Sequence, residues 1–326
     1  MTKDEFLAQI FESQMFKKWH WFRWHFEHHL RGGYHPLADS IVDACLECEN
    51  YLPNFSIEMI NRISSLSGKE KFLPHWEQLL QQLSEIHVVK QALTYNWGDK
   101  NTEFLWEPTA GNSKKNPEIA VKTKDFSIGI EVKAPSIFEH MKNRSSKEIQ
   151  VPSRVIPKGS VEKMFGVGSI TFPRDNPIKD FLLSAESKFK NFKASLPNFY
   201  GLLVIVWDDF IYEPISALLN TGSGIFTEHS FAKDGKGKNL EFPSVDGVII
   251  LRHLHQFIRV CRDEPLMDNC RHPFDYGRPD EFPFKVYVSN PSNPEIPEKV
   301  LDCFQAYPPK PEMGAEYMPT DIIYWT

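Results

Sequence analysis

Apolar residues recur at helical spacing through the first seventy residues and again over a long stretch that follows them. The segment KDEFLAQIFESQMFKKWHWFRWHFEHHL predicts a helix that ends at the RGG of residues 31–33, and Pro36 can begin a second helix through ADSIVDACLECEN. SIEMINRISSL predicts a third helix. The stretch from Leu73 to Thr94 predicts a long fourth helix, because its leucines and isoleucine form one apolar stripe.

After Asn96 the pattern changes to short segments in which polar and apolar residues alternate. TEFLWEP, EIAVKT and FSIGIEVKA are separated by Gly, Pro and polar residues, so they predict consecutive antiparallel strands. PIKDFLLSAESKFKNFKASL then predicts a helix, and the apolar run GLLVIVWDD is typical of a strand buried on both faces. A short helix in EPISALLN and two further strands in VDGVIILRH and FKVYVSN complete the pattern.

This order of elements predicts an α/β fold with a central mixed sheet flanked by helices. We expect a core over residues 71–305, an N-terminal helical region over residues 1–70, and a Pro-rich C-terminal tail over residues 306–326. The stretch from Pro135 to Pro173 is polar and charged, and it predicts a helix after Pro135 followed by a loop.

Composition narrows the class of protein. Hydrophobic residues make up 41% of the chain and charged residues 25%, as in ordinary soluble globular proteins. The chain has no apolar run long enough to predict a membrane span, and its N-terminus has no apolar signal core. Five cysteines, an odd number, do not predict a disulfide framework, so we expect a cytoplasmic protein.

Charge is unevenly distributed along the chain. The net charge of -6 argues against non-specific binding of nucleic acid by the whole surface. Residues 114–193, however, contain sixteen Lys or Arg against nine Asp or Glu. A basic middle segment suits a phosphodiester substrate, although a solvated basic face accounts for the charge equally well.

Glu131 and Lys133 lie two residues apart on a predicted strand, so their side chains point to the same face. Hydrolysis of a phosphodiester calls for a divalent metal and an activated water, and Mg²⁺ prefers oxygen ligands. Glu118 begins the preceding predicted strand and would supply a second carboxylate if the two strands form a hairpin. The pattern therefore predicts a metal-assisted hydrolytic site.

The PE of residues 117–118, followed by the IEVK of residues 130–133, resembles the motif of the PD-(D/E)xK nuclease superfamily, which has the restriction-endonuclease-like fold. The order of elements is also similar between Leu73 and Leu254. A long helix carrying Glu85 precedes the strands, and a helix followed by an apolar strand comes after them.

The resemblance implies roles for five residues and a function. Glu118, Glu131 and Glu85 would hold Mg²⁺ or Mn²⁺, Lys133 would support the attacking water, and Lys188 on the following helix would face the site. The implied protein is a metal-dependent nuclease that hydrolyses DNA rather than RNA, acts as a homodimer and serves in restriction or defence against foreign DNA. Glu118 stands where the family usually has aspartate, which leaves open whether the site is active.

Two other interpretations of the motif remain. Glu131 and Lys133 can face water on a surface ribbon and form a weak ion pair. Alternatively, the chain is a non-catalytic nucleic-acid- or protein-binding module built on the same fold.

Two further groups of residues carry possible chemistry. In WHWFRWHFEHHLRGGYHP, His25 and His29 lie four residues apart and can share a helix face toward a metal, and the interleaved aromatic residues can stack on single-stranded bases. Such an aromatic stripe is more often part of a core or an interface. A structural zinc site is the second option, with candidate ligands Cys45, Cys48, Cys261, Cys270 and His272.

Overall fold

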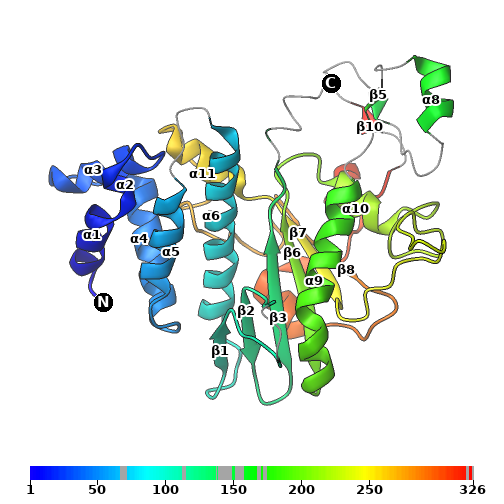
Figure 1. Ribbon diagram of the computed structural model, residues 1–326, viewed down its shortest axis with the longest axis horizontal. Coiled ribbons are helices and arrows are strands. Elements are labelled where there is room, and N and C mark those ends of the chain that lie inside the picture. Colours follow the sequence, from blue (N-terminus) through cyan, green and yellow to red (C-terminus); the bar gives the residue numbers. More distant parts are fainter. Residues whose placement is uncertain are drawn as a thin grey trace.

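The computed structural model describes residues 1–66, 72–111, 115–136, 138, 149–150, 158–166, 170–171, 175–320 and 323–324. It confirms an α/β protein in which helices flank a seven-stranded mixed sheet (Figure 1). The helices are α1 (Lys3–Glu12), α2 (Gln14–Lys17), α3 (Arg23–Leu30), α4 (Pro36–Glu49), α5 (Phe55–Ser65), α6 (Leu73–Thr94), α8 (Lys158–Phe165), α9 (Asp175–Ser195), α10 (Tyr212–Leu219), α11 (Leu254–Cys261), α12 (Glu298–Phe304) and the 3-10 helices η1 (Pro311–Met313) and η2 (Ala315–Tyr317).

The large sheet has the strand order β1-β2-β3-β6-β7-β8-β9. Neighbouring strands along this order pair antiparallel, antiparallel, parallel, parallel, antiparallel and parallel. Its strands are β1 (Glu103–Trp106), β2 (Ile119–Lys122), β3 (Ser127–Lys133), β6 (Phe199–Val206), β7 (Gly247–Leu251), β8 (Lys285–Ser289) and β9 (Ala306–Tyr307). A separate three-stranded sheet has the order β10-β4-β5, formed by β10 (Ile323–Tyr324), β4 (Ile149–Gln150) and β5 (Ile170–Thr171).

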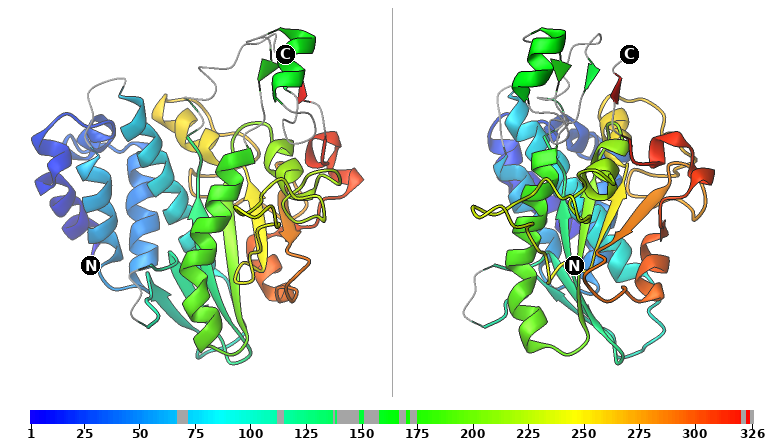
Figure 2. Two further views of the ribbon diagram at one scale, coloured as in Figure 1. Left: turned by 45° about the vertical axis from the view of Figure 1, so that its right-hand side comes forward. Right: turned by 90° about the vertical axis from the view of Figure 1, so that its right-hand side faces the viewer.

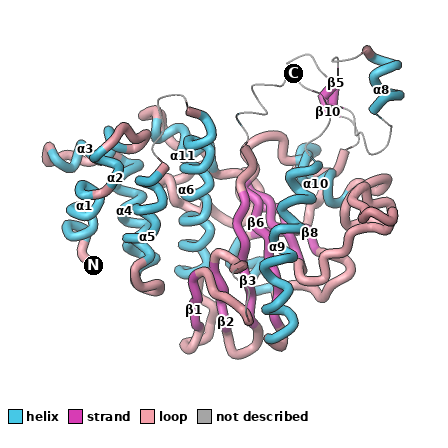
Figure 3. Tube along the Cα trace, in the orientation of Figure 1, coloured by secondary structure: helices cyan, strands magenta, loops and turns pink. Residues whose placement is uncertain are grey.

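The central strand β6 is buried on both faces, as its apolar run predicts. Leu202 and Val204 belong to one hydrophobic cluster, which contains α4, α5 and α6, while Leu203 and Ile205 belong to a second cluster with α9 and α10. Helices α6 and α9 therefore cover opposite faces of the sheet around β3 and β6 (Figures 2 and 3). The first cluster continues without interruption into α1 and α4, so the N-terminal helices share a core with the sheet.

The prediction of one helix from residue 3 to residue 30 is wrong, because three helices replace it. Ser13 is extended and its hydroxyl accepts a hydrogen bond from the Met15 N–H, which ends α1 and caps α2. His20 is buried, and its ring contacts the Phe22 N–H and the Ile63 carbonyl, which separates α2 from α3. Side-chain hydrogen bonds to the backbone thus override the apolar spacing at these two points.

Several other predictions can be compared with the structure. The helices through Pro36–Glu49, Phe55–Ser65 and Leu73–Thr94 and the strands β1, β2 and β3 are confirmed. Within the Pro-rich tail, residues 306–307 form edge strand β9 and residues 311–317 form η1 and η2. The helix predicted after Pro135 falls largely outside the described residues. Among the described residues, no helix combines the length and apolar character needed to cross a bilayer.

Helix α9 lies close against the sheet because two strand residues have no side chain. A Cβ at Gly129 of β3 would lie 2.7 Å from the Phe199 ring and 3.2 Å from the Phe189 ring. At Gly201 of β6 it would meet the Ser244 carbonyl oxygen and, at 2.5 Å, the Phe189 ring. These glycines allow Phe189 to pack directly on the strands, and the adjacent Lys188 is thereby directed at β3.

Gly201→Ala should destabilise the protein. One of the groups that the new methyl group meets is a backbone carbonyl, which cannot rotate away, so we expect the free energy of unfolding to fall by about 1–3 kcal/mol. Urea denaturation followed by circular dichroism measures the change. Gly235→Ala, where no atom lies within 4 Å of the added Cβ, is the matched control. Equal denaturation midpoints for the two variants would contradict the close packing of α9.

Candidate metal centre

The ends of strands β1 and β2 bring two glutamates together. The register pairs Trp106 with Ile119, and one step further the Glu107 N–H donates to the Glu118 carbonyl oxygen at 3.0 Å. The Glu118 N–H donates in turn to the carbonyl oxygen of Ile130, next to Glu131, at 3.0 Å. The hairpin that the sequence predicts between β2 and β3 is therefore present, and it places Glu118 beside Glu131.

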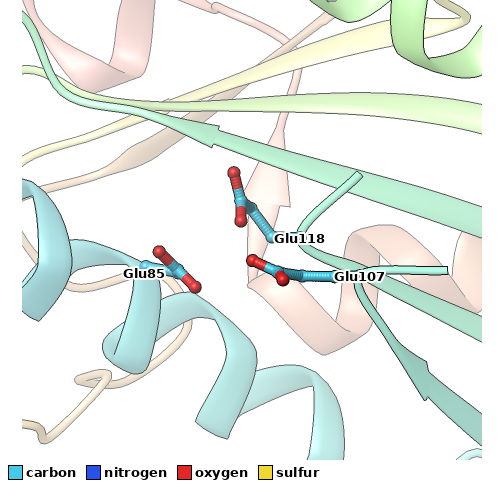
Figure 4. A group of neighbouring side chains, drawn as sticks. All are labelled: Glu85, Glu107 and Glu118. Atoms are coloured by element: carbon cyan, nitrogen blue, oxygen red, sulfur yellow. The ribbon is translucent and has the colours of Figure 1, made fainter. Parts of the chain in front are cut away.

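A third glutamate comes from helix α6. Glu85 is buried, and its carboxylate lies with those of Glu107 and Glu118 in a group whose ligand atoms are all within 4.8 Å of one another. Figure 4 shows the three carboxylates turned toward a common space, one from α6 and two from the strand ends. Among the described residues, this is the one group of three or more His, Cys, Asp or Glu side chains with the spacing of metal ligands.

The Glu107 backbone is unusual. Glu107 follows β1 with a φ of 42°, in the left-handed region that non-glycine residues seldom adopt. A backbone conformation of this kind costs free energy and persists where the surrounding structure fixes it, often at a functional site. Here it turns the chain out of the strand at the point where the Glu107 carboxylate meets Glu85 and Glu118.

Arg62 of helix α5 is the cation closest to two of these carboxylates. Its Nη1 lies 2.8 Å from Glu107 Oε1 and 3.6 Å from Glu85 Oε1, and its Nε lies 3.1 Å from Glu58 Oε1. The guanidinium also stacks over the Trp106 ring, 5.2 Å from its centroid. The N-terminal helical region therefore contributes a charge to the site.

Burial and mutual repulsion shift the pKa values of two carboxyl groups in this cluster. Burial, followed by the charge of Glu118, raises the pKa of Glu85 well above its ordinary value. Burial, followed by the charge of Glu131, raises the pKa of Glu118 to about 7. Glu85 Oε1 is buried and accepts no hydrogen bond. These carboxylates are held together at an electrostatic cost that a divalent cation would relieve.

Glu131 has a different environment. Its side chain is fully buried, and Oε1 lies 2.6 Å from Lys133 Nζ and 2.7 Å from Lys188 Nζ. Lys188 Nζ also lies 3.5 Å from Glu118 Oε1. Although burial acts to lower the pKa of Lys188, the carboxylates of Glu131 and Glu118 raise it. The interpretation of Glu131 and Lys133 as a water-facing surface pair is therefore wrong, because Glu131 has no exposure.

An open cleft of about 390 Å³ gives access to this arrangement. It is lined by Gln81, Gln82 and Glu85 from α6, by Glu118 and Lys133 at the ends of strands, and by residues of α9. From α9 the lining residues are Asp180, Phe181 and Ser184. A substrate phosphate in the cleft would thus meet an ammonium group and acidic groups together.

The five residues singled out from the sequence, Glu85, Glu118, Glu131, Lys133 and Lys188, lie around one place. Their individual roles stay predictions. Sequence reasoning missed Glu107 and Arg62. The one signal for Glu107 was its position opposite Glu118, and this position can be recognised only when the register of the hairpin is known. Nothing near Arg62 in the sequence pointed to the site.

The other predicted metal ligands do not assemble in this way among the described residues. Cys45 and Cys48 are buried on α4, where burial raises the pKa of both thiols and so disfavours the thiolates that bind zinc. His25 is buried as well and belongs to no group of three ligands.

Comparison with known proteins finds no family model that matches this chain, and no curated protein or solved structure that is similar to it. The resemblance to PD-(D/E)xK nucleases therefore stays a prediction from the motif and the order of elements in the sequence.

Glu118→Gln should change how stability depends on pH. The pKa of Glu118 in the folded protein, about 7, lies above the ordinary 4.5, so its stabilising contribution is fully present below pH 4.5 and is lost as the pH rises through about 7. Glutamine mimics the protonated acid. We therefore expect the variant to gain about 1–3 kcal/mol of unfolding free energy relative to wild type across this range.

Urea titrations at a series of pH values in EDTA measure this difference. Glu103→Gln is the control, because the Glu103 side chain on neighbouring strand β1 is 68% exposed. Stability curves that run parallel for Glu118→Gln and wild type would contradict the raised pKa.

Proposed function

We propose that the protein is a metal-dependent nuclease that hydrolyses phosphodiester bonds in DNA. The observation that carries the proposal is the grouping of Glu85, Glu107 and Glu118 beside the ion pairs of Glu131 with two lysines, at a cleft lined by Glu85, Glu118 and Lys133. Carboxylates that surround a common space, with ammonium groups beside them, match the needs of metal-assisted phosphoryl chemistry.

We further propose that the core has the restriction-endonuclease-like fold. Helix α6, the antiparallel strands β1 to β3, helix α9 and the buried strand β6 follow one another in the order that the resemblance implies. Preference for DNA over RNA, action as a homodimer, and a role in restriction or defence are parts of the proposal that rest on the resemblance alone.

The donor set fits a hard divalent cation. All three grouped ligands are carboxylates, which suit Mg²⁺ or Mn²⁺ rather than zinc or copper, and Glu85 Oε1 is buried without a hydrogen bond. Glu85, Glu107 and Glu118 would hold the ion, with Glu131 next to them. When bound, a divalent ion polarises the phosphate and lowers the pKa of a water ligand.

The two lysines lie beside the buried carboxylate of Glu131. Lys133 lines the cleft and lies 2.6 Å from Glu131, so its ammonium can position a water and offset charge that develops on the phosphate. Lys188 bridges Glu131 and Glu118, which fixes the relative orientation of these two carboxylates. Glutamate in place of the usual aspartate at position 118 extends the carboxylate toward Glu85 and Glu107.

A second candidate function is a non-catalytic binding module on the same fold. The observation in its favour is Arg62, which already pairs with Glu107 and lies 3.6 Å from Glu85. If the guanidinium is the permanent counter-ion of the cluster, no metal is needed to balance its charge. Metal binding and cleavage distinguish these two functions.

Mn²⁺ should stabilise the wild-type protein. A ligand that binds only the folded state at a concentration of about 100 Kd adds about 2.7 kcal/mol of stability. We expect the melting temperature to rise with MnCl₂, and Glu107→Gln and Glu85→Gln each to remove most of that rise. Glu103→Gln, at the exposed first position of strand β1, should keep it. A melting temperature that does not respond to Mn²⁺ or Mg²⁺ would favour Arg62 as the permanent partner.

Purified protein should cleave nucleic acid only with a divalent metal. Supercoiled plasmid, linear duplex, single-stranded DNA and RNA are incubated with Mg²⁺, Mn²⁺ or EDTA, and we expect DNA to be cut. Glu131→Gln and Lys133→Ala should each lower the rate at least about 100-fold, the size typical of losing one charge-stabilising group. Glu103→Gln again serves as the control. Cleavage activity that Glu131→Gln leaves unchanged would contradict the nuclease proposal.

A further inference from the structure

The segment that joins α2 to α4 displays aromatic rings to solvent. Trp19 is 46% exposed, Trp24 is 53% exposed and Tyr34 is 68% exposed. Large aromatic residues usually bury most of their surface. The sequence pattern here is only partly that of a core, because Phe22 and Phe26 are fully buried while the tryptophans between them are not.

The same segment is basic. Residues 13–35 contain Lys17, Lys18, Arg23 and Arg31 against a single acidic residue, Glu27, in a chain whose net charge is -6. Lys17, Lys18 and Arg31 are exposed, whereas Arg23 pairs with Glu27 at 2.8 Å. An exposed surface of this composition attracts a polyanion.

A hollow of about 310 Å³ lies within this surface, at the lower end of the range of about 300–1,000 Å³ for small-molecule sites. It is lined by Trp21 and His25, by Leu73 and Trp76 of α6, and by Ile258 and Arg262 at α11. Three separate parts of the chain therefore build an aromatic pocket with an exposed guanidinium beside it.

The two exposed tryptophans pack against residues that line the hollow. The Trp19 ring packs edge-on against Trp21, with 4.9 Å between centroids, and the Trp24 ring packs edge-on against His25, with 5.2 Å between centroids. Because Trp21 and His25 line the hollow, the rings of Trp19 and Trp24 are each in contact with one of its lining residues.

Trp21 Nε1 and His25 Nδ1 are buried atoms of two residues that line the hollow. His25 Nε2 donates to the Cys261 carbonyl at 3.4 Å, and burial lowers the pKa of His25 to about 4. The imidazole is thus neutral near pH 7. The hollow therefore offers the uncharged aromatic rings of Trp21, His25 and Trp76 to a planar base.

We propose that Lys17, Lys18, Trp19, Trp24, Arg31 and the hollow, together called the tryptophan surface, bind single-stranded nucleic acid. Bases stack on Trp19 and Trp24, one base enters the hollow, and the lysines and arginines contact phosphates. A duplex does not fit this scheme, because its bases are already stacked on each other. This inference rests on the proposed function for the choice of nucleic acid as the ligand. It deepens that function by assigning a binding site for an unpaired part of the nucleic-acid substrate.

Binding is measured by fluorescence anisotropy with labelled single-stranded DNA, single-stranded RNA and duplex DNA, on the full chain in EDTA so that no cleavage occurs. Single strands should bind more tightly than duplex. Trp19→Ala and Trp24→Ala should each weaken single-strand binding about tenfold, the loss of one stacked base. Tyr51→Ala is the control, since Tyr51 is an exposed aromatic residue outside this surface, 44% exposed.

The salt dependence of binding tests the role of the cations. Lys17→Gln combined with Lys18→Gln should reduce the slope of log K against log salt by about 1.4 in magnitude, because each phosphate contact on a single strand contributes about 0.7. Lys100→Gln combined with Lys124→Gln removes the same charge from exposed positions beside strands β1 and β2, and should leave the slope unchanged.

Absence of single-strand binding, or binding that neither tryptophan variant weakens, would overturn the inference. So would a wild-type dimer that Trp24→Ala converts to a monomer in light scattering without any effect on nucleic acid, because the surface would then contact a second copy. Urea midpoints check that each variant remains folded. Wild-type protein that binds single strands in EDTA but cleaves no nucleic acid with Mg²⁺ or Mn²⁺ would refute the nuclease proposal and leave this one standing.

Discussion

A completely buried carboxylate, Glu131, is the constraint on which the rest of the site depends. A charge without solvent is tolerated only when cations compensate it, and removal of one partner of such a pair costs about 3–5 kcal/mol. Lys133 comes from the same strand, but Lys188 comes from α9 across the sheet face. The packing of α9 on Gly129 and Gly201 is therefore also an electrostatic requirement, since it delivers the second ammonium group.

The neighbouring acidic cluster is compensated far less well. Glu85, Glu107 and Glu118 have Arg62 at one edge and Lys188 at 3.5 Å from Glu118, and burial raises the pKa of both Glu85 and Glu118. Natural sequences tend to remove such conflicts unless a site needs them. Glu131 is paired with two lysines, whereas these glutamates are compensated by fewer cations, so the site has a neutralised half and a half with uncompensated negative charge.

The sequence predicted the helices and strands better than it predicted the register between neighbouring strands. Alternation along β3 placed Glu131 and Lys133 on one face, because the two-residue period of a strand is a property of the backbone. The class of fold followed from the order of elements in the same way. Glu107 could not be found, because its neighbour across the hairpin depends on the register between β1 and β2, which the loop of residues 107–118 leaves undetermined.

Arg62 illustrates a second limit, and it changes how the N-terminal helices are understood. Helix periodicity shows which face of α5 is apolar but not which distant carboxylate an exposed cation meets. In the fold, α5 packs on α6, and Arg62 passes over the Trp106 ring to reach Glu107. The same hydrophobic cluster extends through Phe22 and Phe26 to the base of the tryptophan surface. The helical region is thus joined to the acidic site by a shared core and by a direct ion pair, so a strand held at the tryptophan surface would be held in a fixed position relative to the carboxylates.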